Sequence, residues 1–143
     1  MTGNVRFGVA VHVLVMLALE EGARTSTGIA ASVNTNPVVI RRILGLLQAA
    51  GLVRGHTGAG GGFELARWPE NVSLAQVFRA VEADGPAPPA HRPNRKCPVG
   101  RHVSAVLASI GTQAERAFLA SLARHTLADA VARVRREAGA ELS

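Results

Sequence analysis

Four of the five residues at positions 58–62 are glycine, and this cluster constrains what the surrounding chain can form. Dense glycines occur in phosphate-binding loops, in dinucleotide-binding folds and at tight hairpin turns. A Walker-type loop needs Lys and then Ser or Thr after its last glycine, whereas Phe63 and Glu64 follow here. The dinucleotide fingerprint fails as well, because Phe63 occupies the place of its third glycine. We therefore interpret the cluster as the tip of a β-hairpin, where glycine supplies positive φ.

Three helices are predicted before this hairpin. The first, from about 5 to 21, has an apolar run too short to span a bilayer and indicates a buried helix. The second opens near Ser26, and the third runs from Pro37 to about Ala50 with Asn36 as its N-cap. Helical spacing gives the third helix a core-facing stripe of Ile40, Ile43, Leu44 and Leu47. Two helices joined by a short turn and followed by a hairpin predict a mainly α fold with a small β-hairpin, a winged helix-turn-helix.

The opposite face of the third helix is free to touch a partner. Sixteen Lys and Arg against ten Asp and Glu give a net charge of +6, and all but Lys96 of these cations are arginines. Arginine suits bidentate contacts with phosphate and guanine, so double-stranded DNA is the predicted partner. The predicted contact residues lie in the turn, the third helix and the wing: Thr35, Asn36, Val38, Val39, Arg41, Arg42, Arg54, Thr57, Gly58, Gly60, Gly61 and Gly62.

The chain after the hairpin changes composition sharply. A short helix capped by Ser73 is followed by a segment, 85–98, that holds five of the seven prolines and no acidic residue. We predict a DNA-binding domain at 1–84, a basic proline-rich linker at 85–98, and a dimerisation helix plus a C-terminal helix at 99–143. The long helix has little of its own domain left to pack on, so its apolar stripe predicts a homodimer interface formed by Val103, Leu107, Ile110, Ala114, Phe118 and Leu122.

The segment NPVVIRRILGLLQAAGLV, followed by GAGGGFELAR and VSLAQVFRAVE, resembles the Rrf-type family of winged-helix regulators. This family includes the IscR, NsrR, CymR and YwnA-like groups, and the resemblance runs from about Arg6 to Glu82. It implies a cytoplasmic homodimer that binds operator DNA and usually represses transcription. Because the apolar run is too short to span a bilayer and the glycine cluster fits no nucleotide-binding motif, we expect neither a membrane partner nor an enzyme. Relatives that hold an iron–sulfur cluster carry three linker cysteines, whereas this chain has only Cys97, so no metal or cofactor is expected.

The resemblance is imperfect where DNA is read. Cluster-binding relatives tend to show Ser, Tyr and Glu early on the recognition helix, where this chain has Val38, Val39 and Arg41. An Arg often precedes the wing glycines in the family, and Thr57 stands there instead. These departures predict an operator sequence different from that of the cluster-binding relatives.

The sequence allows two interpretations of Cys97: it is an incidental thiol, or it senses oxidants or electrophiles. A helix start just after Pro98 favours the thiolate, as do the basic neighbours Arg95, Lys96, Arg101 and His102. A metal site with His91 and His102 is a minority alternative that lacks a fourth ligand. A thiol enzyme using Cys97 and His102 lacks a preorganised orienting group and oxyanion site. A winged helix used only for protein contacts stays open as the main alternative, and the effector is unknown.

Overall fold

The structure is a computed structural model that describes residues 5–20, 22–83, 85 and 92–142. It confirms the predicted fold class, a mainly helical chain with one small antiparallel sheet and a long helix after the linker. The expected end of the first helix at Glu21 lies outside the described residues. In chain order the elements are α1 (Val5–Leu19), α2 (Ser26–Val33), α3 (Pro37–Ala49), β1 (Val53–His56), β2 (Gly62–Leu65), the 3-10 helix η1 (Pro69–Asn71), α4 (Leu74–Val81), α5 (Pro98–Ala123), α6 (Leu127–Ala138) and the 3-10 helix η2 (Gly139–Leu142).

Polar caps define the helix-turn-helix. The Thr25 hydroxyl accepts the Gly28 N–H at the start of α2, and α2 ends at Asn34, which has a φ of 59°. The Asn36 side chain accepts the Val38 N–H at 2.8 Å, with Pro37 in the first turn of α3. Such caps satisfy N–H groups that have no partner within the helix. They fix the angle at which α3 leaves the turn.

One aliphatic core lies beneath the helices. The predicted stripe of α3 is fully buried, and it packs with apolar residues of α1, α2 and α4. A Ser73–Gln76 capping box starts α4. The fully buried members from these elements include Val13, Leu14, Ile29, Ile40, Ile43, Leu44, Leu47 and Val77. Burying this aliphatic surface is what holds α3 in place with its other face outward.

The glycine-rich segment forms the predicted hairpin. Strand β1 pairs with β2 in an antiparallel register that sets Val53 opposite Leu65 and His56 opposite Gly62. Arg24 pairs with the free edge of β2 in an isolated antiparallel bridge. Its N–H donates to the Phe63 carbonyl at 2.9 Å, and its carbonyl accepts the Phe63 N–H at 2.7 Å. A Cβ on Gly62 would lie 2.4 Å from the Arg24 carbonyl oxygen, so only glycine fits there. The wing is therefore anchored to the segment that precedes α2.

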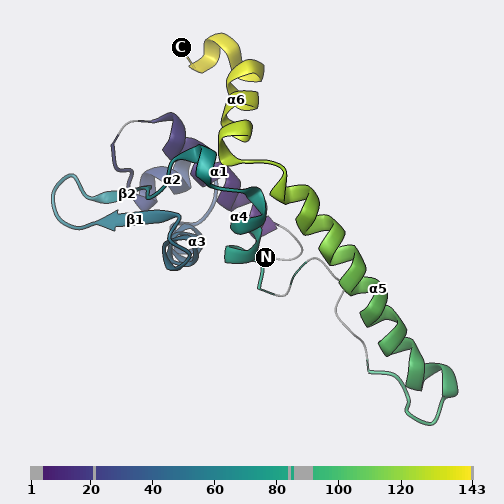
Figure 1. The fold of residues 1–143 in the computed structure, drawn as a ribbon. Helices are drawn as coiled ribbons and strands as arrows, with labels where there is room; N and C mark the ends of the chain where they lie inside the picture. Colours follow the sequence, from purple (N-terminus) through teal and green to yellow (C-terminus); the bar gives the residue numbers. More distant parts are fainter. Residues whose placement is uncertain (1–4, 21, 84, 86–91, 143) are drawn as a thin grey trace.

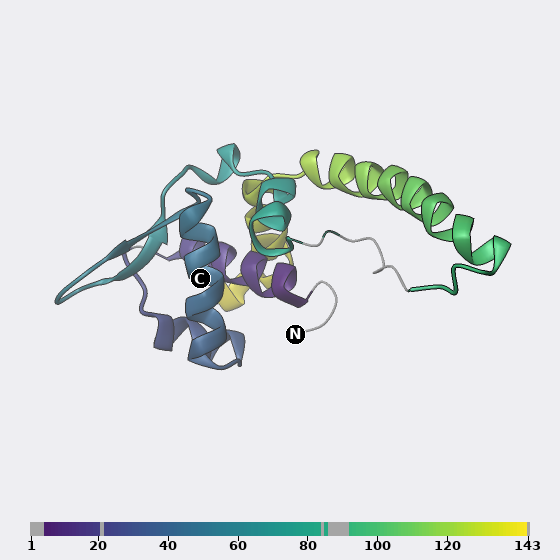
Figure 2. The ribbon, with the colours of Figure 1, turned by 90° about the horizontal axis from the view of Figure 1, so that it is seen from below.

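Three phenylalanine rings join α1, α4 and α5. The Phe78 ring meets Phe7 and Phe118 edge to face, with centroid distances of 5.4 and 4.9 Å. This contact corrects the expectation that the long helix has little of its own domain to pack on, because the C-terminal part of α5 packs on α4. The N-terminal part of α5 projects away from the domain, on the side opposite the hairpin in both views (Figures 1 and 2).

Helix α6 returns to the domain core. Leu127 is fully buried and Val131 nearly so, within the same cluster as residues of α1 and α3. The Leu127 N–H donates to the Val72 carbonyl at 2.8 Å, and Ser73 and Thr126 form an isolated bridge. Helix α6 therefore belongs to the same hydrophobic core as α1, α2, α3 and α4. Within the described ranges no helix combines the length and apolar character needed to cross a membrane.

Phe78 is 1% exposed and holds both other rings, so its removal tests the core. Phe78→Ala should lower the free energy of unfolding by about 3–5 kcal/mol, because the loss of apolar contacts is added to the cost of a cavity. Trp68→Ala is the matched control, since Trp68 is 75% exposed and its loss should change stability by less than about 0.5 kcal/mol. Urea unfolding measures both, and equal losses would contradict the packing described.

Candidate nucleic-acid interface

The outward face of α3 carries a hollow of about 370 Å³. It is lined by Val38, Val39 and Arg42 of α3 and by Arg6 of α1. Val38 is 57% exposed, and both Arg41 and Arg42 are exposed. Val39 is half-buried and packs partly on the core, so it presents less surface than Val38. The structure thus brings three of the predicted α3 residues together around one depression.

Arg6 was missed by the sequence analysis. It lies in the first turn of α1, which the apolar pattern predicts as a buried helix. Only the folded arrangement of α1 against α3 brings Arg6 beside Arg42. The single sequence signal was its positive charge at the edge of the apolar run. Arg6 therefore adds a second cation, beside Arg42, to the lining of this hollow.

The turn residues have mostly structural contacts. The Asn36 side-chain oxygen is committed to the Val38 N–H, which leaves its amide NH2 group free of that bond. Thr35 is half-buried, and its N–H donates to the Ala30 carbonyl at 3.1 Å. Both lie at the N-terminal end of α3, where backbone N–H groups and the helix dipole favour an anion.

The wing lies next to α3, because β1 follows that helix and contacts it (Figure 1). At its tip Thr57, Gly58 and Gly60 are exposed, and the two glycines have φ values of 86° and 75°. Gly61 and Gly62 are half-buried and serve the turn and the Arg24 pairing. The exposed tip has almost no side chains, so a phosphate backbone could approach it closely.

Arg54 is not a free cation. Its Nε donates to Glu64 Oε1 at 2.7 Å, and His56 Nε2 lies 2.8 Å from the same oxygen. These bonds, from His56 first and Arg54 second, hold the pKa of Glu64 below its usual value. The sequence analysis did not identify Glu64 or His56, although the alternation of strand residues places positions 54, 56 and 64 on one face of the hairpin.

Cys97 lies at the junction of the linker and α5, as predicted. It is exposed, it is the N-cap of α5, and its Sγ accepts the Gly100 N–H at 3.4 Å. The backbone at Asn94 lies close to this turn, since a Cβ on Gly100 would lie 2.7 Å from the Asn94 carbonyl oxygen. His91, the third member of the alternative metal site, lies outside the described residues.

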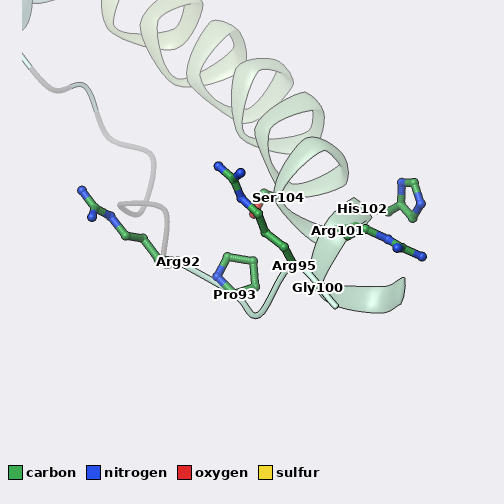
Figure 3. Close-up of a pocket in the computed structure, with 7 residues that line it drawn as sticks. All are labelled: Arg92, Pro93, Arg95, Gly100, Arg101, His102 and Ser104. Atoms are coloured by element: carbon green, nitrogen blue, oxygen red, sulfur yellow. The ribbon is translucent and has the colours of Figure 1, made fainter. Parts of the chain in front are cut away.

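A hollow of about 730 Å³ at the start of α5 has a strongly basic lining. Figure 3 shows that its cations do not converge: Arg92 points away from α5, Arg95 lies along the helix toward Ser104, and Arg101 and His102 point to the other side. Arg95, Arg101 and His102, which the sequence analysis expects near the thiol, line this hollow, but their side chains point in different directions.

The predicted dimer residues divide into two groups. Leu107 and Ile110 are more than half exposed on the projecting part of α5, together with Val99 and Val106, which the prediction omitted. Phe118 packs on Phe78 of its own chain, and Leu122 is half-buried. Val103 is half-buried and Ala114 is exposed. The exposed apolar surface is thus concentrated nearer the start of α5 than predicted.

Comparison with known proteins gives consistent matches over nearly the whole chain. The model of the Rrf2 family, described as an iron-dependent transcriptional regulator, matches residues 4–133. YwnA of Bacillus subtilis (strain 168), named as an HTH-type transcriptional regulator, is 38% identical over 128 residues, which cover 88% of this chain and 94% of YwnA.

Solved structures show the same arrangement. The crystal structure of a protein described as DNA-binding is 36% identical, with a TM-score of 0.70 over 87% of this chain and 97% of that one. The structure of a protein described as a transcriptional regulator from Lactobacillus plantarum is 26% identical, with a TM-score of 0.76 over 94% and 93%.

The donor set does not fit an iron–sulfur cluster held by thiolates. Such clusters use several cysteines, and this chain has one. Within the ranges that the structure describes, no three His, Cys, Asp or Glu side chains gather where they could hold a metal ion. Although the family is described as iron-dependent, a single chain of this protein does not carry the set of cysteine thiolates that would hold an iron–sulfur cluster.

Proposed function

This chain belongs to the Rrf2 family of transcriptional regulators, and we propose that it is a homodimeric, sequence-specific repressor that binds operator DNA in the cytoplasm. The observation that carries the proposal is the outward face of α3, where exposed arginines lie beside a glycine-tipped wing. The proteins that it matches are regulators and not enzymes. In this proposal the segment 1–84 binds DNA through α3 and the wing, and α6 only completes its core. The segment 85–98 is the linker, and α5 dimerises.

The exposed part of α3 suits the major groove. A helix fits that groove, and Arg41 and Arg42 have guanidinium groups that match the O6 and N7 edge of guanine. The exposed Val38 side chain offers an apolar surface for a thymine methyl group. The wing tip would then follow the adjacent phosphate chain, with Thr57 and the glycine N–H groups as donors.

Arg42 is the sharpest test of base reading, because it lines the hollow on α3. Arg42→Ala should weaken operator binding by about 1–3 kcal/mol and relax the preference at one base position. The control is Arg133→Ala on α6, an exposed arginine with the same charge on a helix well away from α3 (Figure 1). Selection of bound duplexes from random DNA, followed by titration, measures both effects.

Two results would favour a protein-interaction module instead. One is operator binding that does not change with Arg42→Ala or Arg41→Ala. The other is DNA binding that does not weaken as salt rises to physiological concentration, because phosphate contacts release counterions and must depend on salt.

The homodimer follows from the exposed apolar residues of α5. Val99, Val106, Leu107 and Ile110 are each more than half exposed, and helical spacing places them on one stripe. Such a stripe on a helix that projects from its domain is typical of an intermolecular helix pair. A two-fold axis through this pair would present two α3 helices to half-sites about 34 Å apart.

Ile110→Glu should therefore give monomers and weaken operator binding at least tenfold, because a buried carboxylate without a partner opposes pairing. Ile110 is the chosen site because Phe118 already stabilises its own chain. The control is Thr112→Glu, which adds the same charge about 200° around the helix. Sedimentation equilibrium measures the mass, and a dimer that persists in Ile110→Glu would refute this interface.

We also propose that Cys97 makes the repressor responsive to oxidants or electrophiles. The thiol is exposed, and its Sγ is the acceptor that caps α5. Hydrogen peroxide would convert the thiolate to a sulfenic acid with release of hydroxide, and conjugate addition to a quinone, followed by protonation of the adduct, would leave a thioether. Either product would disturb the cap at the point where the linker joins the dimerisation helix.

Peroxide or a quinone should change the operator affinity of the native protein at least about tenfold, which requires a bias of only about 1.4 kcal/mol. Cys97→Ser should not respond, and serine preserves the N-cap because its hydroxyl also accepts an N–H. Binding is measured beside mass spectrometry of Cys97. Unchanged affinity of fully modified native protein would show that the thiol is a bystander.

A further inference from the structure

One carboxylate binds both basic side chains of the wing strand. Arg54 and Glu64 are direct cross-strand partners in the hairpin, and His56 is two residues along on the same face. The Arg54 Nε and the His56 Nε2 lie 2.7 and 2.8 Å from the same oxygen, Oε1 of Glu64. We call these three residues the Glu64 cluster. All three side chains are accessible to solvent.

The ionisation of the cluster is fixed by these bonds. The donors hold the pKa of Glu64 below its usual value, so the group is a carboxylate at neutral pH. A carboxylate only accepts hydrogen bonds, so His56 must carry its hydrogen on Nε2. With neutral His56 the cluster has no net charge, because Arg54 and Glu64 cancel.

Glu64 is exceptional in this part of the sequence. No other acidic residue occurs between Glu21 and Glu70, a stretch that contains α2, α3 and the whole wing. The same stretch contains five arginines, at 24, 41, 42, 54 and 67. The one carboxylate in the segment that would face DNA is thus bonded to two basic groups of that segment.

The Glu64 cluster should add little to the stability of the fold. Exposed ion pairs contribute little to the stability of folded proteins, since water already solvates both charges. A carboxylate on a DNA-facing hairpin also repels phosphates. Its effect must therefore be sought in binding.

We propose that Glu64 weakens the sequence-independent attraction of the wing to DNA by holding Arg54 and His56 in an ion-paired cluster. This inference rests on the proposed DNA-binding function. A phosphate that approaches the wing must compete with Glu64 for the Arg54 guanidinium, so the wing adds little affinity for arbitrary sequences. Weak non-specific binding matters because a genome offers a great excess of non-operator sites.

Glu64→Gln tests the inference with a random-sequence duplex. The amide keeps an acceptor for Arg54 but removes the charge, so affinity should rise severalfold at low salt. The slope of log affinity against log salt should steepen by about 0.9, one additional phosphate contact. Raising salt from about 50 to about 200 mM would then cost the variant about threefold more affinity than the native protein.

The matched control is Glu137→Gln, which changes net charge equally on an exposed residue of α6. It should leave both affinity and slope nearly unchanged, because α6 lies away from the wing (Figure 1). Thermal unfolding of each variant checks that the hairpin change has not altered the fold. Equal gains in the two variants would overturn the inference, because total charge would then be responsible.

A double-mutant cycle with Arg54 separates pairing from simple repulsion. Arg54→Gln should lower non-specific affinity less than twofold in the native protein, where Glu64 already engages Arg54. The same change in Glu64→Gln should lower it about threefold or more, because Arg54 is then available to phosphate. Equal effects in both backgrounds would refute the cluster as the cause.

The two proposals fail in different ways. If the native protein bound no duplex at any salt, the proposed DNA-binding function would fall, and the Glu64 inference with it. If the native protein bound DNA with the usual salt dependence and Glu64→Gln left that binding unchanged, only the Glu64 inference would fall.

Discussion

The edge-to-face packing of Phe78 between Phe7 and Phe118 fixes the position of α5 relative to α1 and α4. Helix α4, which carries Phe78, contacts α3 on one side and α5 on the other. The outward face of α3 and the projecting helix α5 are therefore connected through one rigid aromatic contact and the aliphatic core beneath it. A movement of α5 must either carry α4 with it or break this contact.

Acidic and basic residues are distributed unevenly along the chain. The net charge of +6 is spread over the whole chain, but the segment from 22 to 69 carries arginines with a single acid. The fold then pairs that acid with Arg54 and His56, while Arg6 is brought from α1 to the side of Arg42. The electrostatic character of the surface formed by α3 and the wing is thus a product of tertiary structure as much as of composition.

Local signals made most of the fold predictable. The Asn36 cap, the Ile40 to Leu47 stripe and the glycines of the wing each act within a few residues, so the sequence shows them directly. The remaining features depend on residues far apart in the chain: the Phe118 ring packs on Phe78, the Leu127 N–H donates to the Val72 carbonyl, and Arg6 lines the same hollow as Arg42. Periodicity says which face of a helix is apolar, but not which other helix covers it. The Glu64 cluster could have been predicted from the sequence, because the register of the hairpin alone places Arg54 opposite Glu64.

The return of α6 has a consequence for the order in which the protein is made. Leu127 and Val131 fill a core whose other walls are all encoded before residue 82. A ribosome synthesises the chain from its N-terminus, so the helix-turn-helix and wing emerge with that side of their core open, and it closes only when α6 follows. A nascent regulator would therefore finish its DNA-binding domain only after its projecting helix has already been made.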